Sequence, residues 1–123
     1  MPPRAGLRLH QGGVPVETND YANREFSATT ILGDVDGQLQ RPRREAIDVY
    51  LLHSPSVGQL RTDDRAPAFD RPKGEGRVRW VGISTSDHAS GIEAIRRGAD
   101  ALQIEYDLLC PTAEDELLPF AAQ

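Results

Sequence analysis

Three short apolar segments, each carrying polar residues near its carboxyl end, constrain the fold of this chain more than any other feature. They run from Ile47 to His53, from Val78 to Ser84 and from Asp100 to Tyr106. Short apolar runs rich in β-branched and aromatic residues predict strands. Because longer connections separate them, the pattern predicts right-handed βα units and a parallel sheet whose three strands follow chain order.

The chain before these strands divides into two parts. Residues 1–26 are polar and rich in turn formers, so we expect an N-terminal loop, or at most a loose hairpin. From Ser27 the apolar residues Ile31, Val35 and Leu39 recur at helical spacing until Pro42. The sequence therefore predicts a polar loop over 1–26 and one domain over 27–123 that opens with an amphipathic helix.

Helix signals also follow each predicted strand. Pro67 and Pro72 interrupt the first connection, where we expect at most a short helix. Ser90 and Glu93 have the spacing of a capping box in the second connection. Thr112 is a candidate N-cap for a last helix near the end of the sequence.

Size and charge limit the classes of function. The 123 residues are far fewer than the roughly 250 of a complete eight-fold barrel. A net charge of −5 argues against nucleic acid or an anionic membrane as partner. The single cysteine, Cys110, and the lack of a long apolar run predict a cytoplasmic protein without disulfides.

Polar residues follow one another at the carboxyl ends of the predicted strands. Ligands gather at these ends in parallel sheets. The pairs are His53 with Ser54, Ser84 with Thr85, and Gln103 with Glu105. Any one of these residues alone is more often structural than functional, but together they predict a polar binding site. His10, His53, His88 and Cys110 lack the spacing of metal ligands, so we expect no metal site.

The sequence contains the motifs "IDVYLLHSP", "GRVRWVGIST" and "ALQIEYDLLCPTAEDELLPFAAQ". They resemble strand motifs of the aldo-keto reductase superfamily and occur in the order in which that family has them. The resemblance implies a partial (β/α)8 TIM barrel with about three parallel strands and crossover helices. It also implies an oxidoreductase that reduces a small carbonyl substrate with NADPH.

The resemblance assigns roles to residues of the polar ends. His53 corresponds to the catalytic histidine that hydrogen-bonds the substrate carbonyl. Ser84 and Gln103 correspond to cofactor-binding residues that hold the nicotinamide carboxamide, and Thr85 stands where the family usually has Asn. These residue types suit the reaction, because hydride transfer needs a nicotinamide held at a fixed orientation by hydroxyl and amide groups.

Other parts of the family pattern have no counterpart. The resemblance implies a catalytic Asp, Tyr and Lys, but the only lysine, Lys73, precedes the second strand at its amino end. Tyr21 lies in "NDYAN", which lacks the family motif around the catalytic tyrosine. The later strands, with their cofactor-binding residues, also have no match. We therefore expect a truncated chain that is inactive alone.

Two interpretations of such a chain stay open. In the first, it is an aldo-keto reductase that works with another chain supplying the other units. In the second, it is a non-catalytic barrel fragment that acts only as an interaction module or is decaying. Open sheet edges predict self-association in either case.

Overall fold

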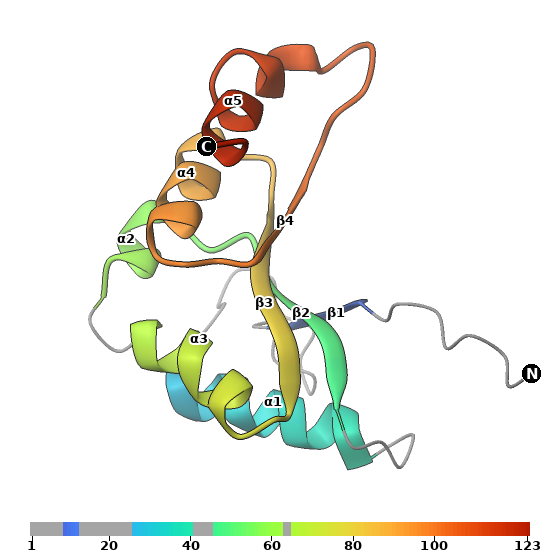
Figure 1. The fold of residues 1–123 in the computed structure, drawn as a ribbon, viewed down its shortest axis with the longest axis vertical. Helices are drawn as coiled ribbons and strands as arrows, with labels where there is room; N and C mark the ends of the chain where they lie inside the picture. Colours follow the sequence, from blue (N-terminus) through green and yellow to red (C-terminus); the bar gives the residue numbers. More distant parts are fainter. Residues whose placement is uncertain (1–8, 13–25, 41–45, 63–64) are drawn as a thin grey trace, which may run out of the picture.

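The computed structural model describes residues 9–12, 26–40, 46–62 and 65–123. Within them the chain alternates strands and helices (Figure 1). The strands are β1 (Leu9–Gly12), β2 (Ile47–His53), β3 (Val78–Thr85) and β4 (Ala101–Ile104). The helices are α1 (Ala28–Gln40), α2 (Val57–Leu60), α3 (Arg65–Gly74), α4 (His88–Arg96) and α5 (Leu117–Ala121), with a 3₁₀ turn, η1, at Pro111–Glu114.

The strands form one parallel sheet in the order β1-β2-β3-β4. The α/β class, the parallel pairing and the sequential order are as predicted. The number of strands differs, because β1 lies in the segment that was expected to be a loop. Its four residues include only one large apolar side chain, Leu9, and are too short to show an alternating pattern.

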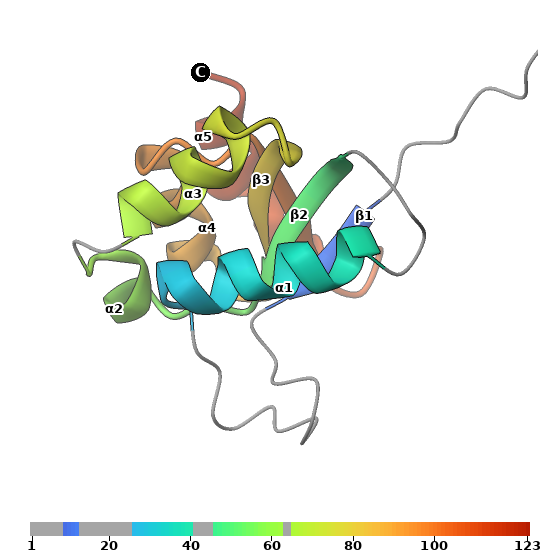
Figure 2. The same ribbon diagram turned by 90° about the horizontal axis from the view of Figure 1, so that it is seen from below.

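Helices cover one face of the sheet (Figures 1 and 2). The predicted helix after Ser27 is present as α1 and buries Ile31 and Val35 against this face. The strands contribute buried side chains to the same core, among which Tyr50 is completely buried. The other strand members of this core are Ile47, Leu52, Val78, Val81 and Ile83.

The opposite face of the sheet is concave. Gln11 of β1 and Gln103 of β4 lie on strands at opposite edges, yet their side chains are joined by a hydrogen bond of 2.7 Å. Three strand spacings of about 4.8 Å would separate these strands by about 14 Å in a flat sheet. The two glutamine side chains span most of this separation and a curl of the sheet toward this face closes the rest, while Leu51 lies 1% exposed between the two edges.

The connection after β2 contains more helix than its prolines predict. Ser56 caps α2 through a capping box, in which its hydroxyl accepts from the Gln59 N–H and Gln59 bonds back to Ser56. Helix α3 then runs through Pro67, in its first turn, and Pro72, near its end. The expectation of at most one short helix was wrong, because prolines near helix ends remove few backbone hydrogen bonds.

The helix caps in the second half of the chain also differ from those that the sequence predicted. Asp87, not Ser90, is the N-cap of α4, because its carboxylate accepts from both the N–H and the hydroxyl of Ser90. Thr112 lies inside the 3₁₀ turn and caps no helix, and α5 begins later, after Glu116. Pro111 at the start of the 3₁₀ turn has no N–H to bond, which favours a tight turn there.

Ion pairs tie the amino ends of the strands to their surroundings. Lys73, as predicted, lies on this side, where its Nζ is 2.9 Å from Oδ2 of Asp100. The same carboxylate accepts from the N–H of Val81 at 2.9 Å and so links the middle of β3 to the start of β4. The other pairs at these ends are Arg77 with Asp36 and Glu75, and Arg79 with Asp48.

Candidate functional site

Three of the predicted site residues form a row across the carboxyl ends of adjacent strands. His53 is in register with Ser84, and Ser84 is in register with Gln103. Neighbouring strands lie about 4.8 Å apart, so the three side chains are neighbours. Alternation along β2 puts His53 on the same face as Leu51, which is the concave face. The structure therefore brings a ring nitrogen donor or acceptor, a hydroxyl and an amide together at one edge.

A pocket of about 330 Å³ opens at this edge. Its lining is mainly polar and consists of the loop residues and strand ends Ser54, Ser84, Thr85, Ser86, Gln103, Ile104 and Glu105. A volume of this size is at the lower end of the range that small-molecule sites occupy. The pocket is large enough for one aromatic ring with a polar substituent, rather than for a whole dinucleotide.

The backbone after His53 has an unusual conformation that closes the row. Ser54 has a φ of 50°, in the left-handed region that non-glycine residues seldom adopt. In this conformation its N–H donates to the carbonyl oxygen of Ser84 at 2.6 Å. The pairing of β2 with β3 thus continues past the end of β2 and holds His53 beside Ser84.

Thr85, the fourth predicted site residue, is directed differently from Ser84. It is in register with Ile104, and consecutive residues of a strand point to opposite faces. Its side chain is 6% exposed, and its hydroxyl accepts from the N–H of Asp87 at 3.0 Å. Thr85 therefore connects the end of β3 to the start of α4.

The sequence interpretation missed Gln11, because it lies in the segment that was expected to be a loop. In the structure its Nε2 donates to Oε1 of Gln103, so its side chain reaches the row from the far edge of the sheet. No local signal reveals this contact, since the two residues are 92 positions apart. Only the curl of the sheet brings them together.

The described tyrosines lie away from the row. Tyr50 is buried on the helix-covered face, where its hydroxyl donates to Oδ2 of Asp34 at 3.0 Å. Tyr106 follows β4 and donates its hydroxyl to Glu114. Tyr21 lies outside the described residues. Among the residues that the structure describes, His53 is therefore the titratable side chain in the row itself.

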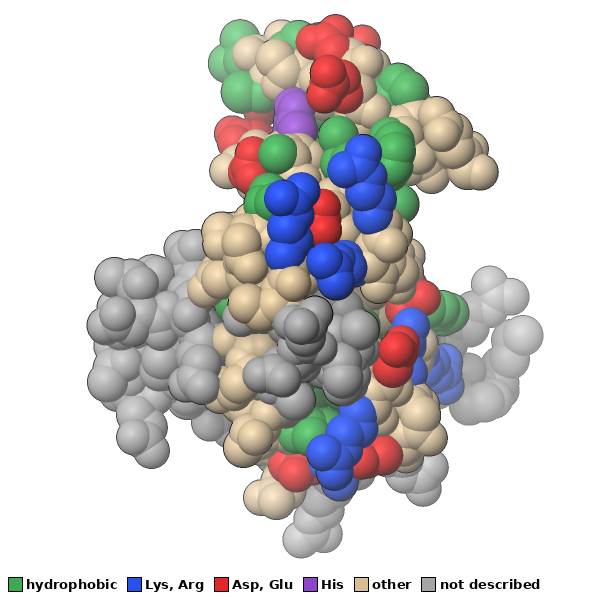
Figure 3. All heavy atoms as spheres, turned by 90° about the vertical axis from the view of Figure 1, so that its left-hand side faces the viewer, with side chains coloured by type: hydrophobic (Ala, Val, Ile, Leu, Met, Phe, Trp, Pro, Cys, Tyr) green, Lys and Arg blue, Asp and Glu red, His purple; other side chains and the backbone are tan. Residues whose placement is uncertain are grey.

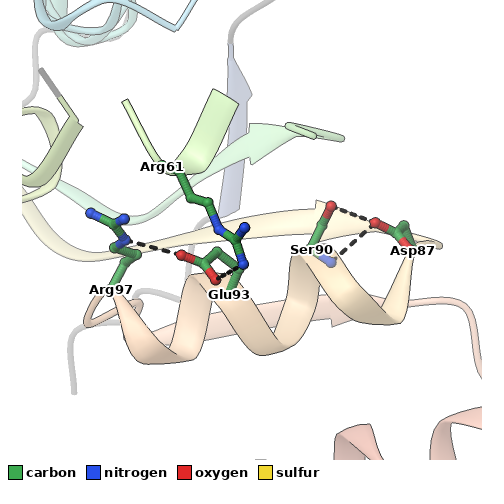
Figure 4. A network of polar contacts seen from close by, with 5 residues as sticks. All are labelled: Arg61, Asp87, Ser90, Glu93 and Arg97. Atoms are coloured by element: carbon green, nitrogen blue, oxygen red, sulfur yellow. Dashed lines mark hydrogen bonds and ion pairs between the residues drawn. The ribbon is translucent and has the colours of Figure 1, made fainter. Parts of the chain in front are cut away.

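Helix α4 starts directly after the row and is held by a polar network (Figure 4). Hydrogen bonds from Ser90 hold the pKa of the Asp87 carboxyl below its ordinary value. Hydrogen bonds from Arg61, at 3.3 Å, and from Arg97, at 3.1 Å, do the same for the pKa of Glu93. Figure 3 shows basic and acidic side chains next to one another on the face of the molecule that is at the left in Figure 1.

This network predicts a loss of stability in acid. A carboxyl group whose pKa is lowered by folding stabilises the fold above its ordinary pKa, and this contribution is lost as the pH falls through the lowered value. For Asp87 and Glu93 the loss should set in below about pH 4.5.

Urea unfolding midpoints of the native chain should therefore fall between about pH 5 and pH 2 by more than those of Asp87→Asn or Glu93→Gln. Equal acid sensitivity in all three chains would contradict this role. Asn retains the capping oxygen, so Asp87→Asn also serves as a control for the cap.

Comparison with known proteins decides the family. The model of the "Aldo/keto reductase family" matches residues 14–123. The chain belongs to the aldo-keto reductase family. Over 99 residues it is 30% identical to the NADH-specific methylglyoxal reductase of Escherichia coli, an alignment that covers 78% of this chain and 30% of that protein.

Solved structures of aldo-keto reductases have the same fold. An aldo-keto reductase of Bacillus halodurans, in its holo form, superposes with a TM-score of 0.82 at 23% identity over 94% of this chain and 39% of that one. A putative aldo-keto reductase of Pseudomonas aeruginosa gives 0.71 at 26% identity over 80% and 38%. The chain thus corresponds to less than half of the length of these TIM barrels.

The family uses nicotinamide cofactors, and the row suits the amide end of such a group. A carboxamide has one carbonyl acceptor and an NH₂ donor, while Ser84 and Gln103 offer both donors and acceptors at adjacent positions. The pocket beside them admits a ring of this size. Within the described residues, no group of His, Cys, Asp and Glu side chains could hold a metal ion, and no helix has the length and apolar character to cross a membrane.

Proposed function

We propose that this chain forms the nicotinamide-binding and carbonyl-binding edge of an aldo-keto reductase, which reduces a small carbonyl compound with NADH or NADPH. The observation that carries the proposal is the row of His53, Ser84 and Gln103, of which Ser84 and Gln103 line one pocket. The reduced nicotinamide, when bound, supplies the hydride.

Each member of the row has a distinct role in this proposal. Gln103 and Ser84 bind the carboxamide and so fix the orientation of the nicotinamide ring, which lowers the entropic cost of bringing it against the substrate. Thr85 acts indirectly, because its hydroxyl bonds the backbone of Asp87 and anchors the end of β3. It is a positioning residue for Ser84.

His53 binds the substrate oxygen. An imidazole N–H can donate a hydrogen bond to a carbonyl oxygen and continue to stabilise that oxygen as negative charge develops on it. The Nδ1 atom of His53 is buried, so Nε2 is the nitrogen through which the ring would reach a ligand. With Nδ1 buried, the imidazole ring of His53 is held in place, and its Nε2–H can polarise the substrate carbonyl.

Dinucleotide binding tests the proposal. We expect NADH or NADPH to quench the fluorescence of Trp80, which is on the concave strand face with Ser84 and is 43% exposed. Gln103→Ala and Ser84→Ala should each weaken binding roughly two- to tenfold, since one hydrogen bond contributes about 0.5–1.5 kcal/mol. Gln40→Ala, an exposed glutamine at the end of α1, is the matched control and should bind as the native chain does.

The same binding assay shows which of the two cofactors the chain prefers and which carbonyl compounds it binds. The E. coli relative is named as NADH-specific, so NADH and NADPH are titrated in parallel, and its name makes methylglyoxal the first carbonyl to test. His53→Ala should leave dinucleotide affinity unchanged and weaken the binding of the carbonyl compound. If His53→Ala lowered the affinity for the dinucleotide and for the carbonyl compound equally, the result would point to a folding defect instead of the proposed role.

A non-catalytic module is the second candidate function. It is favoured by the positions of Tyr50 and Tyr106, which bond Asp34 and Glu114 away from the row. A folded chain that binds neither dinucleotide would support this second function and refute the first. Binding without turnover would instead direct the search to a chain that supplies a proton donor.

A further inference from the structure

We propose that Gln11 sets the direction in which Gln103 presents its amide, and thereby the direction in which a nicotinamide carboxamide binds. This inference rests on the proposed function and deepens it. Gln11 is a positioning residue, since it acts through Gln103.

The first step is the position of the contact. Gln11 Nε2 donates to Gln103 Oε1 at 2.7 Å, across the two strands that separate β1 from β4. The space between them is free of large side chains on the β4 side, because Gly82 and Ala101 occupy the registered positions next to Leu51. Gln103 also lines the pocket, so the residue that bonds Gln11 also borders the ligand site.

The second step is the chemistry of the glutamine amide. Its oxygen only accepts hydrogen bonds and its nitrogen only donates them, and the two atoms lie on opposite sides of a planar group. When Oε1 of Gln103 faces Gln11, Nε2 faces the other way. Gln103 therefore offers donors to the pocket, and these match the carbonyl oxygen of a carboxamide.

The third step concerns the neighbour of Gln103. The Ser84 hydroxyl is in the adjacent register position and can accept a hydrogen bond. With the ligand carbonyl oxygen at Gln103, the ligand NH₂ group is directed toward Ser84. The pair Gln11 and Gln103 thus selects one of the two orientations of the carboxamide, which differ by a half-turn.

Replacing Gln11 by glutamate reverses the expected polarity. A carboxylate accepts hydrogen bonds and cannot donate them, so Gln11→Glu favours a flipped Gln103 whose Nε2 faces β1 and whose Oε1 faces the pocket. A carboxamide can follow this flip by turning. A ligand with a carbonyl oxygen but no NH₂ group leaves Oε1 of Gln103 unpaired in both orientations, because it has no hydrogen-bond donor.

The test compares NADH with its 3-acetylpyridine analogue, in which a methyl group replaces the NH₂ of the carboxamide. For the native chain, Gln103→Ala should weaken both compounds by the same factor, and Ser84→Ala should weaken NADH alone. For Gln11→Glu, the affinity for NADH should change less than threefold and that for the analogue should fall about tenfold. The added negative charge acts on both compounds alike, so the ratio of the two dissociation constants isolates the amide effect.

A second measurement needs no cofactor. In the free chain, Gln103→Ala should shift the side-chain amide NMR signals of Gln11, and Gln11→Ala should shift those of Gln103, without loss of the backbone signals of β2 and β3. Unshifted signals, or a Gln11→Glu chain in which both compounds change equally, would overturn the inference. A native chain that binds neither compound would refute the proposed function itself, which is a different result.

Discussion

A chain carrying Gly82→Ala is expected to lose the pairing of β3 with β4. A Cβ atom at position 82 would lie 1.8 Å from the carbonyl oxygen of Ala101 and 2.6 Å from its carbonyl carbon. These are backbone atoms and cannot rotate away, so β4 must move. Overpacking in a core costs about 1–3 kcal/mol where side chains can adjust, and we expect a loss at or above the upper end of this range.

Hydrogen exchange and denaturation measure this effect. The amides of β4 should lose protection from exchange in Gly82→Ala, and the midpoint of urea unfolding should fall. Gly33→Ala is the matched control, because nothing lies within 4 Å of its added Cβ on α1. It should stabilise the chain by up to about 1 kcal/mol, since alanine favours helix over glycine. A Gly82→Ala chain as stable as the native one would contradict the tight approach of the strands.

The same substitution bears on the site. Gln103 belongs to β4, and the row depends on its register with Ser84. If β4 detaches, Gln103 leaves both the pocket and its hydrogen bond with Gln11. In Gly82→Ala we expect the fraction of chains that bind dinucleotide to fall with the fraction in which β4 stays folded. Gln103→Ala should instead weaken the affinity for dinucleotide without changing the stability of the chain.

Tyr50 gives the second large effect. Its side chain is completely buried, and its hydroxyl donates to Asp34 under the backbone of Gly12, where a Cβ would lie 1.8 Å from the hydroxyl oxygen. Tyr50→Ala removes an aromatic core side chain and should destabilise the chain by about 3–5 kcal/mol. Tyr50→Phe removes only the hydrogen bond and should cost about 1 kcal/mol. The difference in unfolding free energy between the two variants separates ring packing from the hydroxyl.

Tyr50 also predicts a loss of stability in alkali. Burial, with the nearby Asp34 charge, raises the pKa of its hydroxyl far above the ordinary value of 10.0. A raised pKa means that the protonated hydroxyl stabilises the fold fully below about pH 10, and that this contribution is lost as the pH rises further, by about 1.4 kcal/mol per pH unit. In the native chain the phenolate absorbance of Tyr50 should appear only with unfolding. Tyr50→Phe should remove this part of the alkaline loss, and an unchanged pH profile would argue against it.

The elements that the sequence predicted correctly have strong local signals. Strand β2 is an unbroken apolar run that is buried on both faces, and α1 and α4 have helical spacing or a clear stop. The row followed from topology alone, since parallel strands bring His53, Ser84 and Gln103 to one edge. The separate directions of Ser84 and Thr85 were also within reach of the alternation rule.

The features that the sequence did not predict depend on tertiary contacts. Strand β1 is held by pairing with β2, and its four residues have little preference of their own. The bond between Gln11 and Gln103 requires the curl of the whole sheet. Helix α2 had a usable signal in the spacing of Ser56 and Gln59, which the sequence interpretation did not use because it considered only Pro67 and Pro72.

The ion pairs at the amino ends of the strands have a consequence for how this protein can change over generations. Lys73 with Asp100, and Arg77 with Asp36, stabilise the end of the sheet that lies opposite the row of His53, Ser84 and Gln103. Mutations of these ion pairs and mutations of the row therefore fall on different residues, at opposite ends of the sheet. A lineage can explore new substrates at one end of the sheet while natural selection preserves the foldability of the chain at the other.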